Sequence, residues 1–214
     1  MLYVFAHPDD AEYFCGGCII SNSQNEKNET IVCCATREED EKTALIRKKE
    51  TINAFLDYNV KLDWLEFCDG QFFYDRMHFQ KIKSYIDSIS PDIIITHNQY
   101  DYHNDHRILA RMVFDASSYR YPVLQTDTIN GNDFTPELFV DITNNMEKKL
   151  SMLSCHSSQL ASVNYIDMVK ILNLSRGLQY TGKTNCYCEA FGYFSRYHAN
   201  EIEKRIRKLF CLGD

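Results

Sequence analysis

The chain has 214 residues, a formal net charge of −7 and nine cysteines. A chain of this length fits one domain, which buries roughly 70% of the surface that the unfolded chain exposes. The acidic balance excludes the basic stripe of a typical nucleic-acid-binding protein, and no apolar run of the sequence is long enough to cross a membrane. We therefore expect a single domain over residues 1–214, with no nucleic-acid partner and no membrane span.

The cysteines and the first residues indicate the compartment. An odd number of cysteines in a chain of this size fits free thiols in a reducing cytosol better than a disulfide scaffold. No basic region or leader precedes the first strand, so we expect a cytoplasmic protein. Cys15 and Cys18 flank two glycines with the spacing of a redox or metal motif. We favour the alternative, close packing of a helix on the sheet, because no second pair joins them.

Strands and helices alternate through the first half of the chain, as the spacing of apolar residues indicates. In chain order we expect a strand from Leu2, a helix at Glu12–Asn22, a strand at Thr30–Ala35, a helix at Glu41–Tyr58, a strand at Val60–Leu65, a helix at Arg76–Ile89, a strand at Asp92–Thr96 and a helix at His103–Ser118. This order predicts an α/β fold, a Rossmann-like three-layer αβα arrangement with a mostly parallel sheet and helices on both faces.

The last third of the chain is less regular. We expect strands at Tyr121–Gln125, Leu138–Asp141 and about Cys186–Tyr193, and helices at Asn144–Cys155, Asn164–Ser175 and His198–Phe210. The loop Asp127–Asp133 is rich in turn residues and is expected to form a rim over the pocket. Helical spacing also marks the residues expected to face the core. In the helix from Glu41 these are Ala44, Leu45, Ile52, Phe55 and Leu56.

Reactive side chains stand where the first strand ends, in the segment Leu2–Glu12, LYVFAHPDDAE. Ligands in an open α/β sheet collect beyond the carboxyl ends of the strands, so we expect His7, Asp9 and Asp10 to lie at the site. His7 and Asp10 can bind one ion, and one imidazole nitrogen with one carboxylate makes half of a zinc site. The alternative is that Asp9 or Asp10 only caps the following helix.

A second segment of the same kind is His97–His106, HNQYDYHNDH, which follows the apolar run Ile93–Ile95. His103 and His106 are three residues apart, a spacing that shares one face at the start of a helix. Two strand ends therefore offer histidine and aspartate side chains to one crevice. This convergence favours a site over a helix cap.

These two segments resemble the signatures of the PIG-L/LmbE-like zinc-dependent N-deacetylases, AHPDDE and a later D-x-H-x-D-H. Softer matches continue along most of the chain: Arg47 and Glu50 in an R-x-x-E, FVDIT at Phe139–Thr143, HSSQ at His156–Gln159 and CEAF at Cys188–Phe191. Asn104 departs from the pattern, because the family often has proline there.

The resemblance implies one zinc ion per chain, held by His7, Asp10 and His106, with the fourth tetrahedral position open to water. Asp9 is then the candidate general base. His103 is placed to stabilise the oxyanion if it is protonated, and the alternative for His103 is a fourth zinc ligand. Another divalent metal, such as iron or manganese, could occupy the same residues.

Further residues are expected to support this centre. Asp101 and Asp105 are candidates for orienting the histidine rings and for keeping His103 basic. Arg47 matches the family arginine that contacts substrate, and its alternative is a surface arginine paired with Glu39 or Glu50.

The remaining histidines are not expected at the site: His156 reads as a structural residue at a helix end, and His78 and His198 as surface residues. By resemblance, the reaction removes acetyl from an N-acetylated amino sugar, so the partner is a small-molecule amino-sugar conjugate of the N-acetylglucosamine type. The sequence leaves the attached group and a homo-oligomer open. A non-catalytic sugar-binding or metal-stabilised protein is the alternative, whereas a dinucleotide-binding enzyme is excluded because no G-x-G-x-x-G follows the first strand.

Overall fold

The computed structural model describes residues 1–128, 133–194 and 203–204. Within this part of the chain a seven-stranded sheet has the order β3-β2-β1-β4-β5-β7-β6. The strands are β1 (Leu2–Phe5), β2 (Ile31–Arg37), β3 (Lys61–Cys68), β4 (Ile94–Thr96), β5 (Val123–Thr126), β6 (Leu138–Asp141) and β7 (Cys188–Tyr193). The first five run parallel, and β7 is antiparallel to both of its neighbours. The mostly parallel sheet is confirmed.

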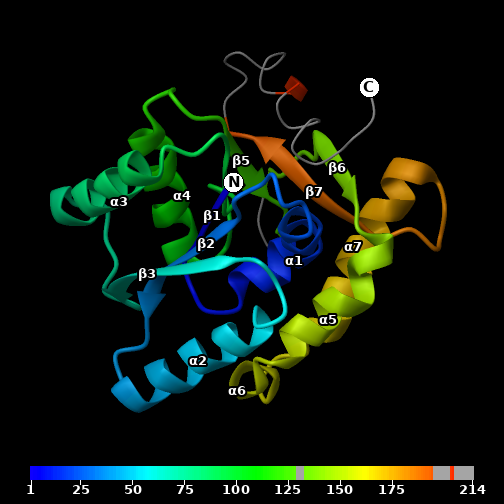
Figure 1. The fold of residues 1–214 in the computed structure, drawn as a ribbon, viewed down its shortest axis with the longest axis horizontal. Helices are drawn as coiled ribbons and strands as arrows, with labels where there is room; N and C mark the ends of the chain where they lie inside the picture. Colours follow the sequence, from blue (N-terminus) through cyan, green and yellow to red (C-terminus); the bar gives the residue numbers. More distant parts are fainter. Residues whose placement is uncertain (129–132, 195–202, 205–214) are drawn as a thin grey trace.

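Helices cover both faces of this sheet (Figure 1). They are α1 (Asp10–Ser23), α2 (Glu41–Ala54), α3 (Arg76–Ile89), α4 (Asn104–Ser117), α5 (Met146–Ser154), α6 (Ser157–Leu160) and α7 (Tyr165–Thr181), with a 3-10 turn at Thr143–Asn145. Helices α3 and α4 pack on one face, while α1, α5 and α7 pack on the other. The predicted three-layer α/β fold is therefore confirmed. Among the described residues, no helix is long and apolar enough to cross a membrane.

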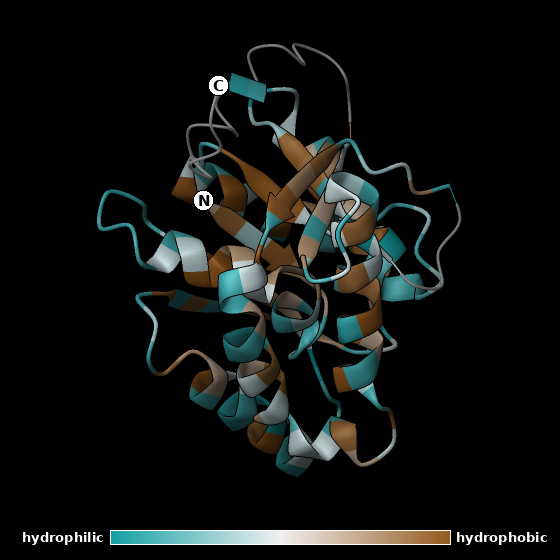
Figure 2. Cartoon of the chain, turned by 90° about the vertical axis from the view of Figure 1, so that its right-hand side faces the viewer, coloured by the Kyte–Doolittle hydropathy of each residue, from teal (hydrophilic) through white to brown (hydrophobic). Residues whose placement is uncertain are grey.

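The central strand β1 is buried on both faces. Tyr3 and Phe5 belong to the core cluster under α1 and α5, and Leu2 and Val4 belong to the cluster under α3 and α4. A continuous apolar run is typical of a parallel strand covered on both sides. Figure 2 shows the result as apolar strands enclosed by helices with hydrophilic outer surfaces.

The strand order fixes the place of the site. Strands β2 and β3 follow β1 on one side, and β4 and β5 lie on the other side. The chain therefore changes direction across the sheet between β1 and β4. In open α/β sheets ligands bind at the carboxyl ends of strands beside such a point, and both histidine-aspartate segments leave the sheet there.

Helix α2 contradicts the expected orientation. It ends at Ala54 rather than Tyr58, and Leu45 and Ile52 are 69% and 45% exposed. Of the residues expected to face the core, Phe55 is buried just past the end of the helix. The buried face carries Arg47 and Glu50 instead. The apolar spacing correctly predicted a helix, but polar contacts to the site region decide which face turns inward.

Two other expectations are corrected. Helix α7 continues past Ser175 to Thr181, where Gly182 ends it in a left-handed conformation with φ 71°. His78 is buried rather than on the surface, because its ring packs edge-on against Phe67 and Phe72. Its backbone N–H donates to Asp75 at the start of α3. Of the expected helix at 198–210 only residues 203–204 are described, and His198 lies outside the described residues.

The segment with two glycines in α1 is confirmed as a packing feature. Cys15 and Cys18 are fully buried free thiols. A Cβ on Gly17 would lie 2.6 Å from the Cβ of Ile142, which follows β6, and a Cβ on Gly16 would lie 2.9 Å from Lys149 of α5. The close approach is therefore to the edge of the sheet and to a neighbouring helix.

A fully buried ion pair ties these layers together. Lys149 Nζ donates to Glu189 Oε1 at 2.7 Å and to Asn173 Oδ1 at 3.0 Å. The Glu189 carboxylate also accepts the backbone N–H groups of Gly17 and Cys18. One carboxylate on β7 thus joins α1, α5 and α7.

Replacing Lys149 with methionine should lower the free energy of unfolding by about 3–5 kcal/mol, because the Glu189 charge would stay buried without its cation. Urea denaturation measures the change. Lys148→Met on the exposed side of the same helix is the control and should shift stability by less than about 0.5 kcal/mol. Equal effects of the two substitutions would contradict this role of the ion pair.

Candidate active site

A pocket of about 320 Å³ opens at the carboxyl ends of the first four strands. Its charged lining consists of His7, Asp9, Asp10, Glu38, Arg47, Asp69, His103 and His106. Aromatic side chains form much of the remaining wall: Tyr13, Phe14, Tyr102 and Tyr165. Thr128 also lines the pocket, so the expected rim is present at its first residues, and 129–132 lie outside the described part of the chain.

Three potential ligand atoms converge in this pocket. His7 Nδ1 and His106 Nε2 are 3.2 Å apart. The Asp10 carboxylate lies 3.3 Å from the first of these nitrogens and 3.4 Å from the second. The structure thus brings together residues separated by almost 100 positions in the chain.

A carboxylate faces the outer nitrogen of each of these two histidines. Asp69 Oδ1 lies 3.2 Å from His7 Nε2, with Asp105 Oδ2 at 3.6 Å. Asp101 Oδ1 lies 3.2 Å from His106 Nδ1. Carboxylates in this position fix the orientation and tautomer of metal-binding histidines. The sequence analysis did not name Asp69 as a site residue. It directly follows β3, so its position at the carboxyl end of a strand could have indicated it.

Charge compensation dominates the electrostatics of the cluster. Burial opposes protonation of both histidines, but the surrounding carboxylates outweigh it. They raise the pKa of His7 well above its ordinary value and that of His106 to about 9. Burial alone would raise the pKa of Asp10, yet the charge of His106 holds it well below its ordinary value. The carboxylates therefore require positive charge here, which a cation could supply in place of protons.

His97 is a second residue that the sequence motifs did not reveal, although it too directly follows a strand. It is fully buried, and its ring stacks on His106 with centroids 3.7 Å apart. It lies close enough to Asp10 and His106 to share an ion. However, its Nε2 accepts the backbone N–H of Ala6 at 2.8 Å, which engages that lone pair. Burial and the charge of His106 lower the pKa of His97 to about 4, so it packs as a neutral ring.

Asp9 does not act as a simple helix cap. It occupies the position before α1 with φ 106°, and its side chain makes no capping hydrogen bond to a described residue. The neighbouring Asp10 carboxylate accepts the backbone N–H of His7 at 2.7 Å instead. Positive φ is strained for a residue with a Cβ, and such strain is typical of functional sites. Burial and then the charge of Asp10 raise the pKa of Asp9 to about 7.

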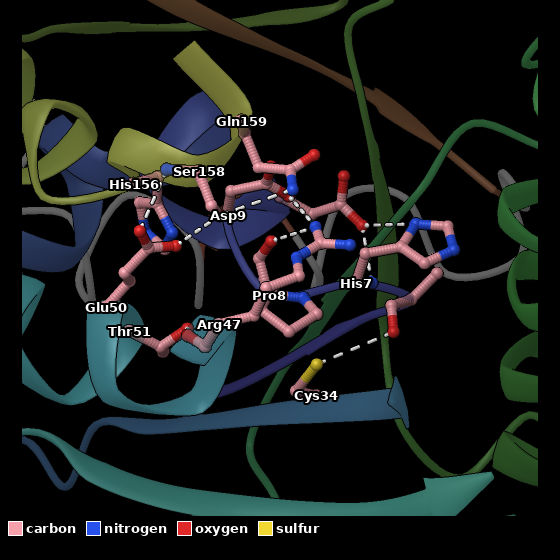
Figure 3. A network of polar contacts seen from close by, with 12 residues as sticks. His7, Pro8, Asp9, Cys34, Arg47, Glu50, Thr51, His156, Ser158 and Gln159 are labelled. Atoms are coloured by element: carbon pink, nitrogen blue, oxygen red, sulfur yellow. Dashed lines mark hydrogen bonds and ion pairs between the residues drawn. The ribbon is translucent and has the colours of Figure 1, made fainter. Parts of the chain in front are cut away.

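Arg47 lies against Asp9 rather than on the surface. It forms an ion pair with Glu38 and donates from Nη2 to the backbone oxygen of Pro8 at 2.7 Å. Its Nη2 is also 3.4 Å from Asp9 Oδ1. Figure 3 shows this guanidinium beside Pro8 and Asp9. Arg47 therefore forms ion pairs with Glu38 and Asp9. The alternative, a surface arginine paired with Glu39 or Glu50, is wrong.

His103 stands at the start of α4, in the same group as His7 and His106. Its Nδ1 accepts the backbone N–H of Asp105 at 3.3 Å, so the neutral ring carries its proton on Nε2. Burial and then the charges of the two other histidines lower its pKa. The charges of Asp10 and Asp105 act to raise the pKa of His103, but burial and the two histidines outweigh them, so the environment does not keep His103 basic.

The segment His156–Gln159 (HSSQ) holds α6 against α1 and α2 through polar contacts. Glu50 accepts hydrogen bonds from both serines, Ser157 and Ser158, and Figure 3 shows Glu50 beside Ser158 and His156. His156 Nε2 lies 2.8 Å from Glu12 Oε1. His156 is fully buried at the start of α6. Its structural role is therefore confirmed.

The family PIG-L, described as GlcNAc-PI de-N-acetylase, matches residues 2–117 of this chain. The match covers more than half of the sequence and includes both histidine-aspartate segments. The chain belongs to the PIG-L family. This PIG-L protein is also similar to the probable N-acetyl-alpha-D-glucosaminyl L-malate deacetylase 2 of Bacillus cereus, with 28% identity over 81% of this chain and 89% of the relative.

Solved structures share the fold of this PIG-L protein. GalB, the 4-carboxy-2-hydroxymuconate hydratase of Pseudomonas putida, has a TM-score of 0.77 at 18% identity and covers 91% of this chain and 95% of its own. The N,N'-diacetylchitobiose deacetylase of Pyrococcus horikoshii has a TM-score of 0.76 at 21% identity and covers 90% and 82%. Since a hydratase and a deacetylase share one fold, the reaction must be argued from the site.

Backbone strain at Asp9 can be measured with two substitutions. Asp9→Gly should be more stable to unfolding than Asp9→Ala by about 1 kcal/mol, because only alanine keeps a Cβ at this φ. The control pair is Lys49→Gly and Lys49→Ala on the exposed side of α2, where glycine should be the less stable by about 1 kcal/mol. Urea denaturation gives both differences. If glycine is also the less stable residue at position 9, the strain assignment is wrong.

Proposed function

We propose that this protein is a metal-dependent hydrolase that removes acetyl from an N-acetylated amino-sugar conjugate. The observation that carries the proposal is the convergence of the side chains of His7, Asp10 and His106, with Asp9 in the same pocket. Membership of the PIG-L family and the name of the Bacillus cereus relative support an N-acetylglucosamine-type substrate.

The donor set fits zinc, one ion per chain. Two ligands bound at about 2.0–2.1 Å to a tetrahedral centre lie about 3.3 Å apart. The two ring nitrogens are 3.2 Å apart, Asp10 Oδ2 lies 3.3 Å from His7 Nδ1, and Asp10 Oδ1 lies 3.4 Å from His106 Nε2. His7, Asp10 and His106 would hold the ion. When bound, zinc supplies a Lewis acid that polarises the amide carbonyl and lowers the pKa of water to about 7. Iron or manganese would suit the same nitrogen and oxygen donors.

Asp9 is the general base in this mechanism. Its strained backbone leaves the carboxylate in the pocket rather than on the helix, and Arg47 lies against it. The carboxylate accepts a proton from the water that attacks the amide carbon. It returns a proton to the sugar nitrogen as the carbon–nitrogen bond breaks, which releases acetate and a free amine.

His103 stabilises the carbonyl oxygen as negative charge develops on it. The ring does not need to be protonated for this role, because the neutral form donates through Nε2 while Nδ1 accepts the Asp105 N–H. A fixed donor aimed at a developing oxyanion is an effective means of lowering the barrier. The alternative role of His103, a fourth metal ligand, would use the same Nε2 and would block hydrolysis.

The pocket suits one sugar ring. Its volume of about 320 Å³ is at the lower end of the range for small-molecule sites. Aromatic side chains provide apolar faces for such a ring, and Arg47 with Glu38 provides hydrogen-bonding groups for its hydroxyls. We therefore assign Arg47 to substrate binding.

Removing one metal ligand should abolish metal binding, whereas removing the base should not. His7→Ala and His106→Ala should each purify with less than about one tenth of the zinc of the unaltered protein, because two ligands remain. Asp9→Ala should keep about one zinc per chain and lose roughly 10²–10⁴-fold in kcat. Metal analysis and amine release from N-acetylglucosamine conjugates provide the two measurements.

His78→Asn is the matched control, because this histidine is buried beside α3 outside the pocket and should leave the zinc content unchanged. Unchanged zinc in both ligand variants would refute the ligand assignment. Full zinc loading without amine release from a broad panel of conjugates would favour a non-catalytic sugar-binding protein instead.

The outer carboxylates should control affinity for the metal. Asp69→Asn and Asp101→Asn should each weaken zinc binding roughly 10–100-fold, because the histidine rings lose the partners that orient them. Competition with a coloured zinc chelator measures the change. Asp57→Asn on the exposed surface is the control and should bind zinc as tightly as the unaltered protein. An unchanged affinity in both test variants would mean that these carboxylates do not support the site.

A further inference from the structure

The ring of Phe14 closes one side of the active-site pocket. Phe14 stands on α1, four residues after Asp10, and this spacing places two side chains on the same face of a helix. The ring is half-buried and lines the pocket. Phe5 and His97 contact it from the core side and are 1% and 0% exposed. Phe14 therefore separates the pocket from the core beside two of the three expected metal ligands.

Four aromatic contacts hold this ring in place. Its centroid lies 6.0 Å from that of Phe5, in a stacked arrangement, and 4.8 Å from that of Tyr13. It meets the ring of His97 edge-on at 5.5 Å and that of His106 at 6.1 Å. Aromatic rings with centroids about 4.5–7 Å apart are in contact. A ligand therefore cannot displace Phe14 without breaking contacts on several sides.

The pocket differs in character between its two sides. Glu38 directly follows β2, Asp69 directly follows β3, and Arg47 reaches in from α2. Phe14 lies on the other side, where its neighbours belong to β1, β4 and α4. The hydroxyls of a sugar therefore find charged partners on the β2–β3 side, and an alkyl group finds an apolar surface at Phe14.

The opening of the pocket sets the direction of the substrate. Tyr102 lines the pocket and is 63% exposed, so it lies at the mouth, whereas Phe14 lies against the fully buried His97. The proposed substrate carries its attached group on the sugar, and this group must extend through the mouth. The acyl group ends the molecule at the nitrogen of the same sugar. It therefore fits the closed side, against Phe14.

We propose that Phe14 limits the acyl group that this enzyme removes to acetyl. The methyl group of the acetyl lies against the Phe14 ring, and each further carbon of a longer acyl chain would collide with it. One methylene more or less in an apolar pocket changes kcat/KM by about 10–200-fold. This inference rests on the proposed function for the hydrolysis of the amide, and Phe14 is a specificity residue that takes no part in proton transfer.

Amine release from the methyl glycosides of N-acetyl-, N-propionyl- and N-butyrylglucosamine gives the first test. The unaltered protein should show a kcat/KM at least about tenfold lower for the propionyl than for the acetyl compound, and lower again for the butyryl compound. Phe14→Ala should raise the ratio of butyryl to acetyl kcat/KM at least about tenfold, because the space of the ring becomes free. Phe14→Leu, which removes less volume, should give an intermediate ratio.

Met168→Ala is the matched control. Met168 lines the same pocket at its border with a neighbouring pocket along α7, away from the contacts of Phe14. This substitution also enlarges the pocket, but it should change the ratio of butyryl to acetyl kcat/KM less than about threefold. An equal rise in Met168→Ala and Phe14→Ala would place the acyl group toward α7 and overturn the assignment to Phe14.

Binding gives the second test, because it requires no turnover. In the Asp9→Asn variant, calorimetry should show the N-butyryl glycoside binding at least about tenfold more weakly than the N-acetyl glycoside. Adding Phe14→Ala or Phe14→Leu should reduce this difference. Urea denaturation of each variant shows that the altered ring position has not unfolded the protein.

The outcomes separate the two proposals. Selective binding of the acetyl form that is lost in Phe14→Ala, without amine release from any conjugate, would support the acyl limit and refute the proposed function. Amide hydrolysis with the same acyl preference in the unaltered protein and in Phe14→Ala would refute the acyl limit alone. Equal hydrolysis of the acetyl and butyryl compounds by the unaltered protein would also refute it, and binding of neither glycoside would refute both proposals.

Discussion

The site depends on a compensation of charge between buried carboxylates and two imidazole rings. Asp10 lies between His7 and His106, and Asp69 and Asp101 lie at their outer nitrogens. Buried carboxylates are costly unless positive charge meets them. The direction change of the chain between β1 and β4 brings these groups together, since each leaves the sheet at the carboxyl end of a strand.

Other features of the structure follow from this centre. Asp9 accepts a left-handed backbone so that its carboxylate stays in the pocket. Helix α2 buries Arg47 and Glu50 and leaves Leu45 exposed. The helix therefore makes polar contacts next to the site and buries less apolar surface. This arrangement costs stability locally. Strain at functional sites commonly has this form.

The sequence predicted the layers of the fold and the meeting of His7, Asp10 and His106, because strand-end position and spacing are local properties of the chain. Asp69 and His97 were missed, although both directly follow strands and the same positional rule applies to them. The expectation that the apolar residues of α2 face the core was wrong. Helical spacing shows which residues share a face, but it does not show whether polar contacts turn another face inward. The pairing of Lys149 with Glu189 joins positions 40 residues apart and has no local signal.

The proposed hydrolysis depends on how many imidazoles would hold a bound metal ion. X-ray absorption at the zinc edge of the loaded protein counts these ligands directly. The account predicts four-coordinate zinc with two imidazole nitrogens and two oxygens at about 2.0–2.1 Å. A spectrum with three imidazoles would place a third histidine, His103 or His97, on the metal and would contradict the assigned ligand set. A sulfur ligand would contradict the site altogether.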